Sequence, residues 1–390
     1  FPDLTLINGW LDPSELVCSA VFVGSLVFGA IPIVLGDWIG RRTVIVWSLF
    51  GIGIIGFASA FSPSFWVLIG LRFLQGAFLN SIATVNFVHC SESVDRWYVA
   101  ACFFGVFWCF GYMILTPLSM LVGTWRWLIG IHSGAALVLG VILFFTLPES
   151  LSQCIAKRDM LKLQDFINKA KRCNNRSYDV DFDVLLTEKL EGIEEKAASL
   201  RDVFSTFTSN PKQLLILFVC GYTQVATLFA YTGLSFVSTS LAAGDPNVNF
   251  VLSGVVELPA YTLMPKLMEW FGSKYSMLVF FLCAPIFLVI LFFIDPNFAT
   301  IYLIIWMISK YLVTSCYVSS LVISSELFPT KCRSFAVGFA LTVSNIGSIL
   351  GPHAGALNGI LPDLAFLFFG GGLLLAAVFI ILIFPRKVKI

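Results

Sequence analysis

The chain has 390 residues, of which 58% are hydrophobic and 12% charged, with mean hydropathy +0.90 and net charge +1. Soluble globular domains carry about 25% charged residues, so the composition predicts a protein that crosses a membrane several times. The near-zero net charge, without a basic patch interleaved with aromatic residues, argues against a nucleic-acid partner. The ten cysteines show neither metal-ligand spacing nor a disulfide framework.

Eleven apolar stretches each approach the roughly 20 residues that a helix needs to cross the hydrocarbon core. Lipid cannot satisfy open backbone groups, so each stretch is expected to be a helix. The expected spans are residues 17–35, 44–60, 64–88, 98–120, 127–147, 213–235, 250–267, 275–294, 298–323, 334–358 and 364–384. The sequence therefore predicts an all-α membrane protein.

One polar block separates two apolar halves. Residues 17–147 and 213–385 are expected to form two helical bundles, and residues 148–212 a cytoplasmic linker with amphipathic helices. The halves repeat one plan, because acidic residues recur at similar spacing. Asp37 lies 55 residues before Glu92 in the first half, and position 269 lies 57 residues before position 326 in the second. Such internal repeats are typical of transporter folds.

Basic residues are distributed unevenly between alternate loops. The loops on the side of the turn at Arg41 hold all of the 24 Lys and Arg residues except Arg126, on the opposite side, and Arg72 and Lys310, within spans. Because cytoplasmic loops carry an excess of Lys and Arg, we expect the N-terminus of this chain outside and its C-terminus in the cytoplasm. The plasma membrane is the expected location.

A polar turn bounded by glycines joins the first two spans, with the sequence Gly36-Asp-Trp-Ile-Gly-Arg-Arg42. Glycine allows turns that are too sharp for other residues. By spacing alone, this is a membrane hairpin with a basic flank. The order Gly-Asp-x-x-Gly-Arg-Arg resembles the turn between the second and third helices of the major facilitator superfamily. The resemblance implies a charge relay that holds the two halves together on the cytoplasmic side.

Other motifs are similar to those of solute carrier family 22, the organic cation, anion and carnitine transporters. They are Leu147-Pro-Glu-Ser150, Tyr231-Thr-Gly-Leu-Ser235, Asn249-Phe-Val-Leu-Ser-Gly-Val-Val-Glu-Leu-Pro-Ala-Tyr261, Ser325-Glu-Leu-Phe-Pro-Thr-Lys-Cys-Arg333 and Ile346-Gly-Ser-Ile-Leu-Gly-Pro352. The resemblance runs from about residue 10 to residue 384 and implies transport of small organic ions by alternating access. That family has twelve helices, and we expect this chain to lack the first.

Two alternatives remain open. Sugar porters share the Gly-Arg-Arg and Pro-Glu-Ser signals, and a non-transporting receptor or regulator of the same fold would share the rest. The expected lack of the first helix favours the second alternative, as does the second-half copy of the polar turn, which has the sequence Phe271-Gly-Ser-Lys274. This departure predicts a weaker contact between the halves there. The resemblance assigns gating roles to Asp37, Arg41, Arg42, Glu92, Arg96, Glu326 and Arg333.

Three ionisable residues lie within spans: Arg72, Glu257 and Lys310. A charge in hydrocarbon costs at least about 2.5–3.5 kcal/mol, so each is expected to mark either a structural pair or the transport cavity. We expect Glu257 and Lys310 to lie in one cavity, paired directly or through substrate or water. For Arg72, an intramembrane charge, the structural and functional interpretations are equally favoured.

Polar and aromatic residues at helical spacing extend this predicted cavity. The predicted substrate-binding residues are Gln224, Tyr231, Glu257, Lys310, Tyr317 and Asn345. Ring faces can bind a cationic substrate, and the candidates for such stacking are Trp108, Phe229, Tyr231 and Tyr261. Small residues in the first span, at Gly24, Ser25, Gly29 and Ala30, are instead expected to allow close helix packing.

Asn345 bears on the class of substrate. In the resembling family, cation transporters carry Asp at this position, and anion and carnitine transporters tend to carry Arg. Neutral Asn345, with one charge of each sign at Glu257 and Lys310, favours a zwitterion such as carnitine, because an unpaired buried charge is penalised. A monovalent organic cation is the close alternative.

No catalytic constellation, phosphate-binding glycine loop or metal-binding helix is visible in the sequence. The three histidines, His89, His132 and His353, are each expected to be satisfied by local partners. We therefore expect neither enzymatic activity nor a cofactor or metal. The expected partners are a small organic ion and the lipid bilayer, with a coupling ion as a further candidate.

Overall fold

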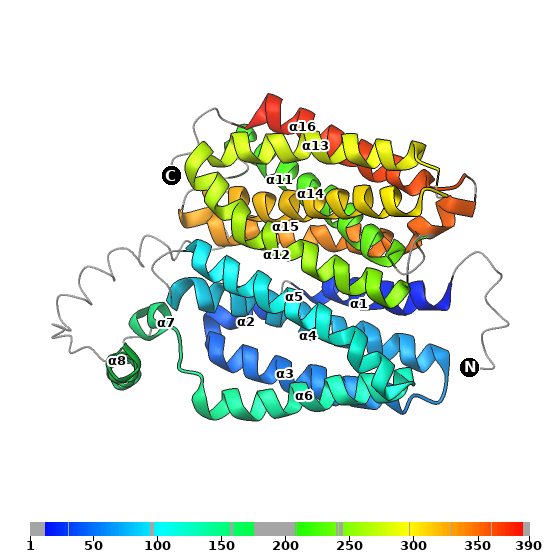
Figure 1. The fold of residues 1–390 in the computed structure, drawn as a ribbon. Helices are drawn as coiled ribbons and strands as arrows, with labels where there is room; N and C mark the ends of the chain where they lie inside the picture. The colour runs from blue at the N-terminus through cyan, green and yellow to red at the C-terminus, as the bar shows by residue number, and fades with distance from the viewer. Residues whose placement is uncertain are drawn as a thin grey trace.

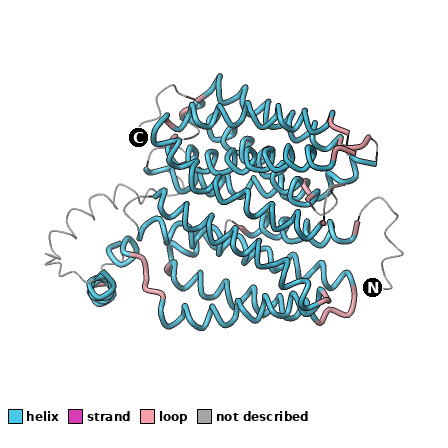
Figure 2. The backbone as a smooth tube through the Cα atoms, in the orientation of Figure 1, coloured by secondary structure: helices cyan, strands magenta, loops and turns pink. Residues whose placement is uncertain are grey.

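The computed structural model describes residues 12–29, 31–93, 97–156, 159–174, 207, 209–238, 241, 245–295, 297–328, 330–359 and 361–384. These residues form helices that run side by side, joined by short loops (Figures 1 and 2). The described part of the chain contains no strand. This agrees with the prediction of an all-α membrane protein.

The first half contains six helices: α1 (Pro13–Phe28), α2 (Ile31–Ile39), α3 (Arg41–Ala60), α4 (Phe65–Ser93), α5 (Trp97–Val122) and α6 (Trp125–Thr146). Two short helices follow in the polar block: α7 (Leu151–Ala156) and α8 (Met160–Asn174). The second half contains α11 (Pro211–Val237), α12 (Pro246–Phe271), α13 (Ser273–Phe293), α14 (Ala299–Glu326), α15 (Thr330–Leu350), the 3₁₀ helix η2 (Pro352–Gly359) and α16 (Leu364–Ile383).

Each of the predicted spans coincides with helix. Among the described residues, nine helices are long and apolar enough to cross a membrane by length and composition. Helix α12, which carries Glu257, Lys266 and Glu269, is not among these nine. The first predicted span was wrong as one continuous helix, since α1 ends at Phe28 and α2 begins at Ile31.

The break in the first span occurs where α1 meets α4. A Cβ atom at Gly29 would lie 2.1 Å from the side-chain nitrogen of Asn80 on α4, so the Asn80 side chain would have to move to admit a larger residue. Further along α1, a Cβ at Gly24 would lie 1.8 Å from the carbonyl oxygen of Phe73. Ser25 Oγ donates to the carbonyl of Gly76 at 2.8 Å. The predicted role of small residues is confirmed at these three α1 positions.

The two halves have the same internal packing. Helix α3 packs against α4 and α6, and its counterpart α13 packs against α14 and α16. A glycine of positive φ directly precedes each of these two helices: Gly40 at 119° precedes α3, and Gly272 at 86° precedes α13. Two residues later, Arg42 donates from Nη2 to the carbonyl of Phe144, and Lys274 donates from Nζ to the carbonyl of Phe384. The second-half turn therefore keeps an equivalent bond despite its different sequence.

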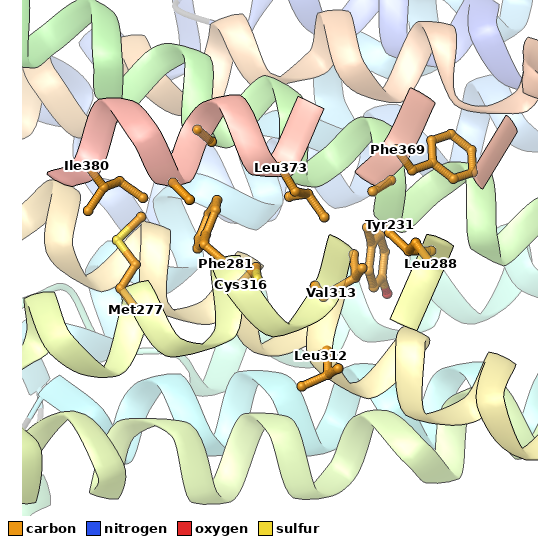
Figure 3. Packing of buried hydrophobic residues seen from close by; sticks show 14 of the residues in the cluster. Tyr231, Met277, Phe281, Leu288, Leu312, Val313, Cys316, Phe369, Leu373 and Ile380 are labelled. Atoms are coloured by element: carbon orange, nitrogen blue, oxygen red, sulfur yellow. The ribbon is translucent and has the colours of Figure 1, made fainter. Parts of the chain in front are cut away.

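The second bundle has a large apolar core. Figure 3 shows Met277, Phe281 and Leu288 of α13 packed against Leu373 and Ile380 of α16. All five side chains are fully buried. Apolar residues of α11 and α14 belong to the same core, and these two helices and α12 also carry the polar side chains described below.

The two halves meet where α1 packs against α15 and where α5 packs against α12. These pairs correspond to each other under the internal repeat. In Figure 1, α1 begins at one end of the bundle, and α7 and α8 lie at the other. In helix α8, Leu163 is buried, whereas Leu161 is 82% exposed.

Candidate functional site

The centre of the candidate site is a buried ion pair between α12 and α14. Lys310 Nζ lies 3.2 Å from Glu257 Oε1, and both side chains have no exposed surface. Helices α12 and α14 pack directly against each other, which brings together two charges that lie 53 residues apart (310 minus 257) in the sequence. The expectation that these residues are paired agrees with this distance. That they lie in a transport cavity stays a prediction.

Tyr231 of α11 covers this ion pair. Its hydroxyl donates to Glu257 Oε2 at 2.9 Å, and Lys310 Nζ lies 3.8 Å from the centroid of its ring. Lys310 also donates to the carbonyl of Tyr231 at 3.2 Å and to Ser235 Oγ at 2.5 Å. The ammonium group is thus surrounded by a carboxylate, two oxygen acceptors and a ring face, which together replace its lost hydration.

Two further aromatic residues extend the network. Trp108 of α5 donates from Nε1 to the Tyr231 hydroxyl at 3.0 Å, and Tyr317 of α14 stacks on Tyr231 with ring centroids 6.0 Å apart. Because α5 belongs to the first half, Trp108 connects the two bundles at the ion pair. Its side chain is 46% exposed, whereas the pair beneath it has no exposed surface.

The other two predicted substrate-binding residues lie outside this network. Gln224 of α11 is fully buried, and within the described residues neither atom of its amide has a hydrogen-bond partner. Asn345 of α15 donates to the carbonyls of Leu341 and Thr342 in its own helix, each at 3.1 Å. Whether either residue contacts a substrate therefore stays a prediction.

Arg72 of α4 belongs to the first bundle and is separate from the central pair. Its Nη1 donates to Gln75 Oε1 on the same helix at 2.8 Å. Among the described residues it forms no ion pair within 4.0 Å, and its Nε has no hydrogen-bond partner. The structure thus leaves both interpretations of this intramembrane charge open.

The predicted gating residues are described only in part. The backbone N–H of Arg42 donates to Glu149 Oε1 at 3.0 Å, so the carboxylate of the Pro-Glu-Ser motif lies at the start of α3. Arg41 is the first residue of α3, and Glu326 is the last residue of α14. Arg96 and the side chains of Asp37, Glu92 and Arg333 lie outside the described residues. The charge relay therefore stays a prediction.

A second polar cluster joins α1 to η2 and was not predicted. His353 Nδ1 lies 3.1 Å from Glu15 Oε2, and His353 Nε2 lies 2.8 Å from Ser19 Oγ. Ser19 Oγ also donates to the carbonyl of Ile349, at 3.1 Å. His353 is satisfied by neighbouring side chains, as expected, although these partners lie 338 and 334 residues away in the sequence. No sequence pattern predicts a contact between side chains so far apart along the chain.

An apolar groove of about 340 Å³ lies between α1, α2, α3 and α4. Its lining includes Phe28, Leu35, Val44 and Phe78, and none of the predicted site residues. The groove lies within the first half, so it is separate from the candidate site.

Comparison with known proteins gives consistent results. Residues 8–256 match the family model described as Major Facilitator Superfamily. The human organic cation/carnitine transporter 2 is 27% identical over 92% of this chain, which spans 64% of that protein's length. The Drosophila melanogaster organic cation transporter protein is 28% identical over 96% of this chain, which spans 68% of its length.

Among solved structures, the chain is similar to an inward-open conformation of the xylose transporter XylE from E. coli. The TM-score is 0.70 at 14% identity, with 99% of this chain and 90% of that chain covered. A second structure, of the proton:xylose symporter XylE bound to 6-bromo-6-deoxy-D-glucose, gives a TM-score of 0.70 at 15% identity. At this identity the likeness concerns the fold alone.

Proposed function

The chain belongs to the Major Facilitator Superfamily, and on that premise we propose that it carries a small organic cation or zwitterion across a membrane by alternating access. The observation that carries this proposal is the buried Glu257–Lys310 pair beneath Tyr231, contacted from the other bundle by Trp108. Transporters built from two repeats bind their substrates near the bilayer midplane at the repeat interface, and the contact of Trp108 with Tyr231 supports placing this pair there.

The curated relatives confirm the resemblance to solute carrier family 22. The family and the apolar helices make this a membrane protein. The plasma membrane and the outside N-terminus are part of the proposal, supported by the distribution of Lys and Arg between alternate loops. A coupling ion remains a candidate partner.

The chemistry of the pair supports an ammonium-bearing substrate. Lys310 already occupies the ring face of Tyr231 and the carboxylate of Glu257, so both groups are positioned to bind a cation. A desolvated ammonium over a ring gains about 2 kcal/mol or more. A substrate ammonium group that enters beside Trp108 would compete with Lys310 for these groups. The released lysine would then be free to bind a substrate carboxylate, which favours a zwitterion.

The proposal is tested by uptake into cells that express the full-length protein, with tetraethylammonium, carnitine and para-aminohippurate as labelled substrates. We expect carnitine or tetraethylammonium to be taken up, and para-aminohippurate to be excluded. Replacing Asn345 changes the charge of the predicted cavity without touching the buried pair. Asn345→Asp should raise cation uptake relative to anion uptake, and Asn345→Arg should do the reverse, each by about tenfold for an interaction of 1.4 kcal/mol.

Two outcomes would contradict parts of this proposal. If neither substitution changes the order of preference among the three substrates, Asn345 does not contact the substrate. If the native protein reaches the cell surface but takes up none of them, a sugar such as xylose is the next substrate to test. Failure there as well would favour a receptor or regulator of the same fold.

A further inference from the structure

One stacked pair of aromatic rings joins the two bundles close to the buried ion pair. The rings of Tyr112 on α5 and Phe250 on α12 have centroids 4.3 Å apart and planes 11° from parallel. Of the ring pairs formed within the described residues, this one alone connects the first half to the second. Both rings are partly exposed, whereas Glu257 and Lys310 have no exposed surface.

Helical spacing places the stack relative to the ion pair. Phe250 lies seven residues (257 minus 250), about two turns, before Glu257, so the two side chains share one face of α12. Tyr112 lies four residues (112 minus 108), about one turn, after Trp108 and shares its face of α5. Along both helices, the step from the polar network to the stack leads toward the end of the bundle at which α1 begins (Figure 1). The stack therefore lies between the network and that end.

A glycine brings the two helices close enough for the rings to stack. A Cβ at Gly254 of α12 would lie 3.1 Å from Met113 Cγ, 3.4 Å from Tyr112 Cβ and 3.5 Å from the carbonyl oxygen of Cys109, all on α5. Helices α5 and α12 thus pack with little space between them at the level of the rings. The rings can part only when the helices themselves separate.

Opening of the bundle at this end must break the stack. Alternating access moves one bundle against the other around the binding site, and the two rings belong to different bundles. An aromatic pair is favoured beyond the area that it buries, by an amount that corresponds to about twofold to tenfold in an equilibrium constant. The stack therefore favours the form that is closed at this end.

We propose that Tyr112 and Phe250 form a gate at the end where α1 begins, and that the cationic group of a substrate opens it. In the closed form each ring covers a face of the other. When the rings part, these faces become free, and a ring face attracts an ammonium group. The cation thus gains contacts in the open form that the closed form lacks, and only such a difference shifts an equilibrium. An anion gains nothing from a ring face.

This inference rests on the proposed transport by alternating access and deepens it, because the gate itself selects cations and zwitterions over anions. The selection takes place before the substrate reaches the Glu257–Lys310 pair. It differs from the role of the pair, which neutralises charge in the closed interior, since the gate acts only in the open form.

The gate is tested without substrate by the distance between the bundles. Spin labels at Thr124→Cys and Asn297→Cys, in exposed loops of the first and second half at this end, are placed in the full-length protein in lipid nanodiscs, with the native cysteines replaced. Tyr112→Leu and Phe250→Leu each remove one ring. Each should raise the ratio of the longer to the shorter distance by about twofold to tenfold. The double variant should match either single variant, because the stack is lost once in all three.

Conservative variants separate the stack from a general loss of packing. Tyr112→Phe and Phe250→Tyr keep both rings, so each should keep the native distance distribution. Phe379→Leu is the matched control. It removes one ring of the pair that Phe379 forms with Tyr222, but both residues belong to the second bundle. It should leave the distance between the bundles unchanged.

The selection of cations is tested in the same samples with tetraethylammonium and para-aminohippurate. Tetraethylammonium should raise the population of the longer distance in the native protein, and para-aminohippurate should not. At saturation, the factor by which the cation multiplies the ratio of open to closed forms equals the ratio of its affinities for them. In Tyr112→Leu that factor should fall by about twofold to thirtyfold, the range of a lost cation–ring contact.

Two results overturn the gate: leucine variants with the native distance distribution, or a Tyr112→Phe variant that behaves as Tyr112→Leu does. Two others overturn its selection of cations: para-aminohippurate that opens the native protein as tetraethylammonium does, or a saturating factor that Tyr112→Leu leaves unchanged. None of these measurements uses uptake. A protein that passes them and takes up no substrate would contradict the proposed transport alone, and uptake without any of these shifts would contradict the gate alone.

Discussion

The Glu257 and Lys310 side chains each neutralise the other's charge in an apolar interior, so the stability of the protein depends on both being present. Removing one member of a buried pair leaves an uncompensated charge and costs about 3–5 kcal/mol, whereas replacing both by neutral residues is often tolerated. We therefore predict that Glu257→Gln and Lys310→Met each lower the thermal unfolding temperature of the purified full-length protein. The double variant should be more stable than either single variant, yet should still fail to transport.

The control for this prediction is Lys266→Met, which removes a lysine from an exposed position of α12. Its unfolding temperature should change little. A double variant that is as unstable as the sum of the two single variants would mean that the residues do not interact, and would contradict the pairing.

At the residue scale, the sequence predicts a contact where a residue is too polar for its surroundings to be stable without a partner. Glu257 and Lys310 were predicted to meet because each is a charge in an apolar span. Glu15 and His353 carried no such demand, because a histidine near a span end can be satisfied by water or by its own loop. The role of Trp108 was only one among several aromatic candidates, since 39 Phe and 10 Tyr residues offer the same ring faces.

At the scale of elements, the close packing of α1 on α4 depends on two glycines, Gly24 of α1 and Gly76 of α4. A Cβ at Gly76 would lie 1.9 Å from the carbonyl oxygen of Val21, so the helices would have to separate. We predict that Gly76→Ala destabilises the protein by about 1–3 kcal/mol, the usual cost of overpacking, as measured by thermal unfolding. Gly70→Ala, on the same helix, is the control, because nothing lies within 4 Å of its added Cβ.

The control sharpens the prediction, because alanine favours helix over glycine by about 0.8–1.0 kcal/mol. Gly70→Ala should therefore be neutral or stabilising. If Gly76→Ala were equally harmless, α1 and α4 would not pack as closely in solution as they do here.

Hydropathy located the helices well because a span must be apolar over nearly its whole length. It could not locate the break after Phe28, since the apolar run continues through residues 31–35. The break lies beside Asn80 of α4, a tertiary neighbour that hydropathy does not report. Similarly, the sequence does not reveal that Arg42 and Lys274 make equivalent hydrogen bonds. Each side chain donates to a backbone carbonyl, and because every residue has one, no sequence motif marks the acceptor.

At the scale of the whole molecule, the arrangement predicts which ends face the same compartment. The start of α1 and the helices α7 and α8 lie at opposite ends of the bundle (Figure 1). With the excess of basic residues on the side of α7 and α8, we predict that an epitope tag inserted after Asn174 is protected in intact cells. A tag inserted before Asp245 should bind antibody without permeabilisation.

Permeabilised cells are the control. Both tags must bind antibody there, which shows that each tag is expressed and recognised. Antibody binding to the Asn174 tag in intact cells would invert the orientation.

The neutrality of the Glu257–Lys310 pair has a consequence for how voltage acts on the protein. A membrane potential does work on a moving charge, about 2.3 kcal/mol per elementary charge for each 100 mV crossed. Two opposite charges held 3.2 Å apart move together when the second bundle turns, so the work on one cancels the work on the other. The pair therefore adds no gating charge of its own. In an electrical recording, the charge moved in each cycle would therefore come from the substrate, any coupled ion and the other charged residues, and not from this pair.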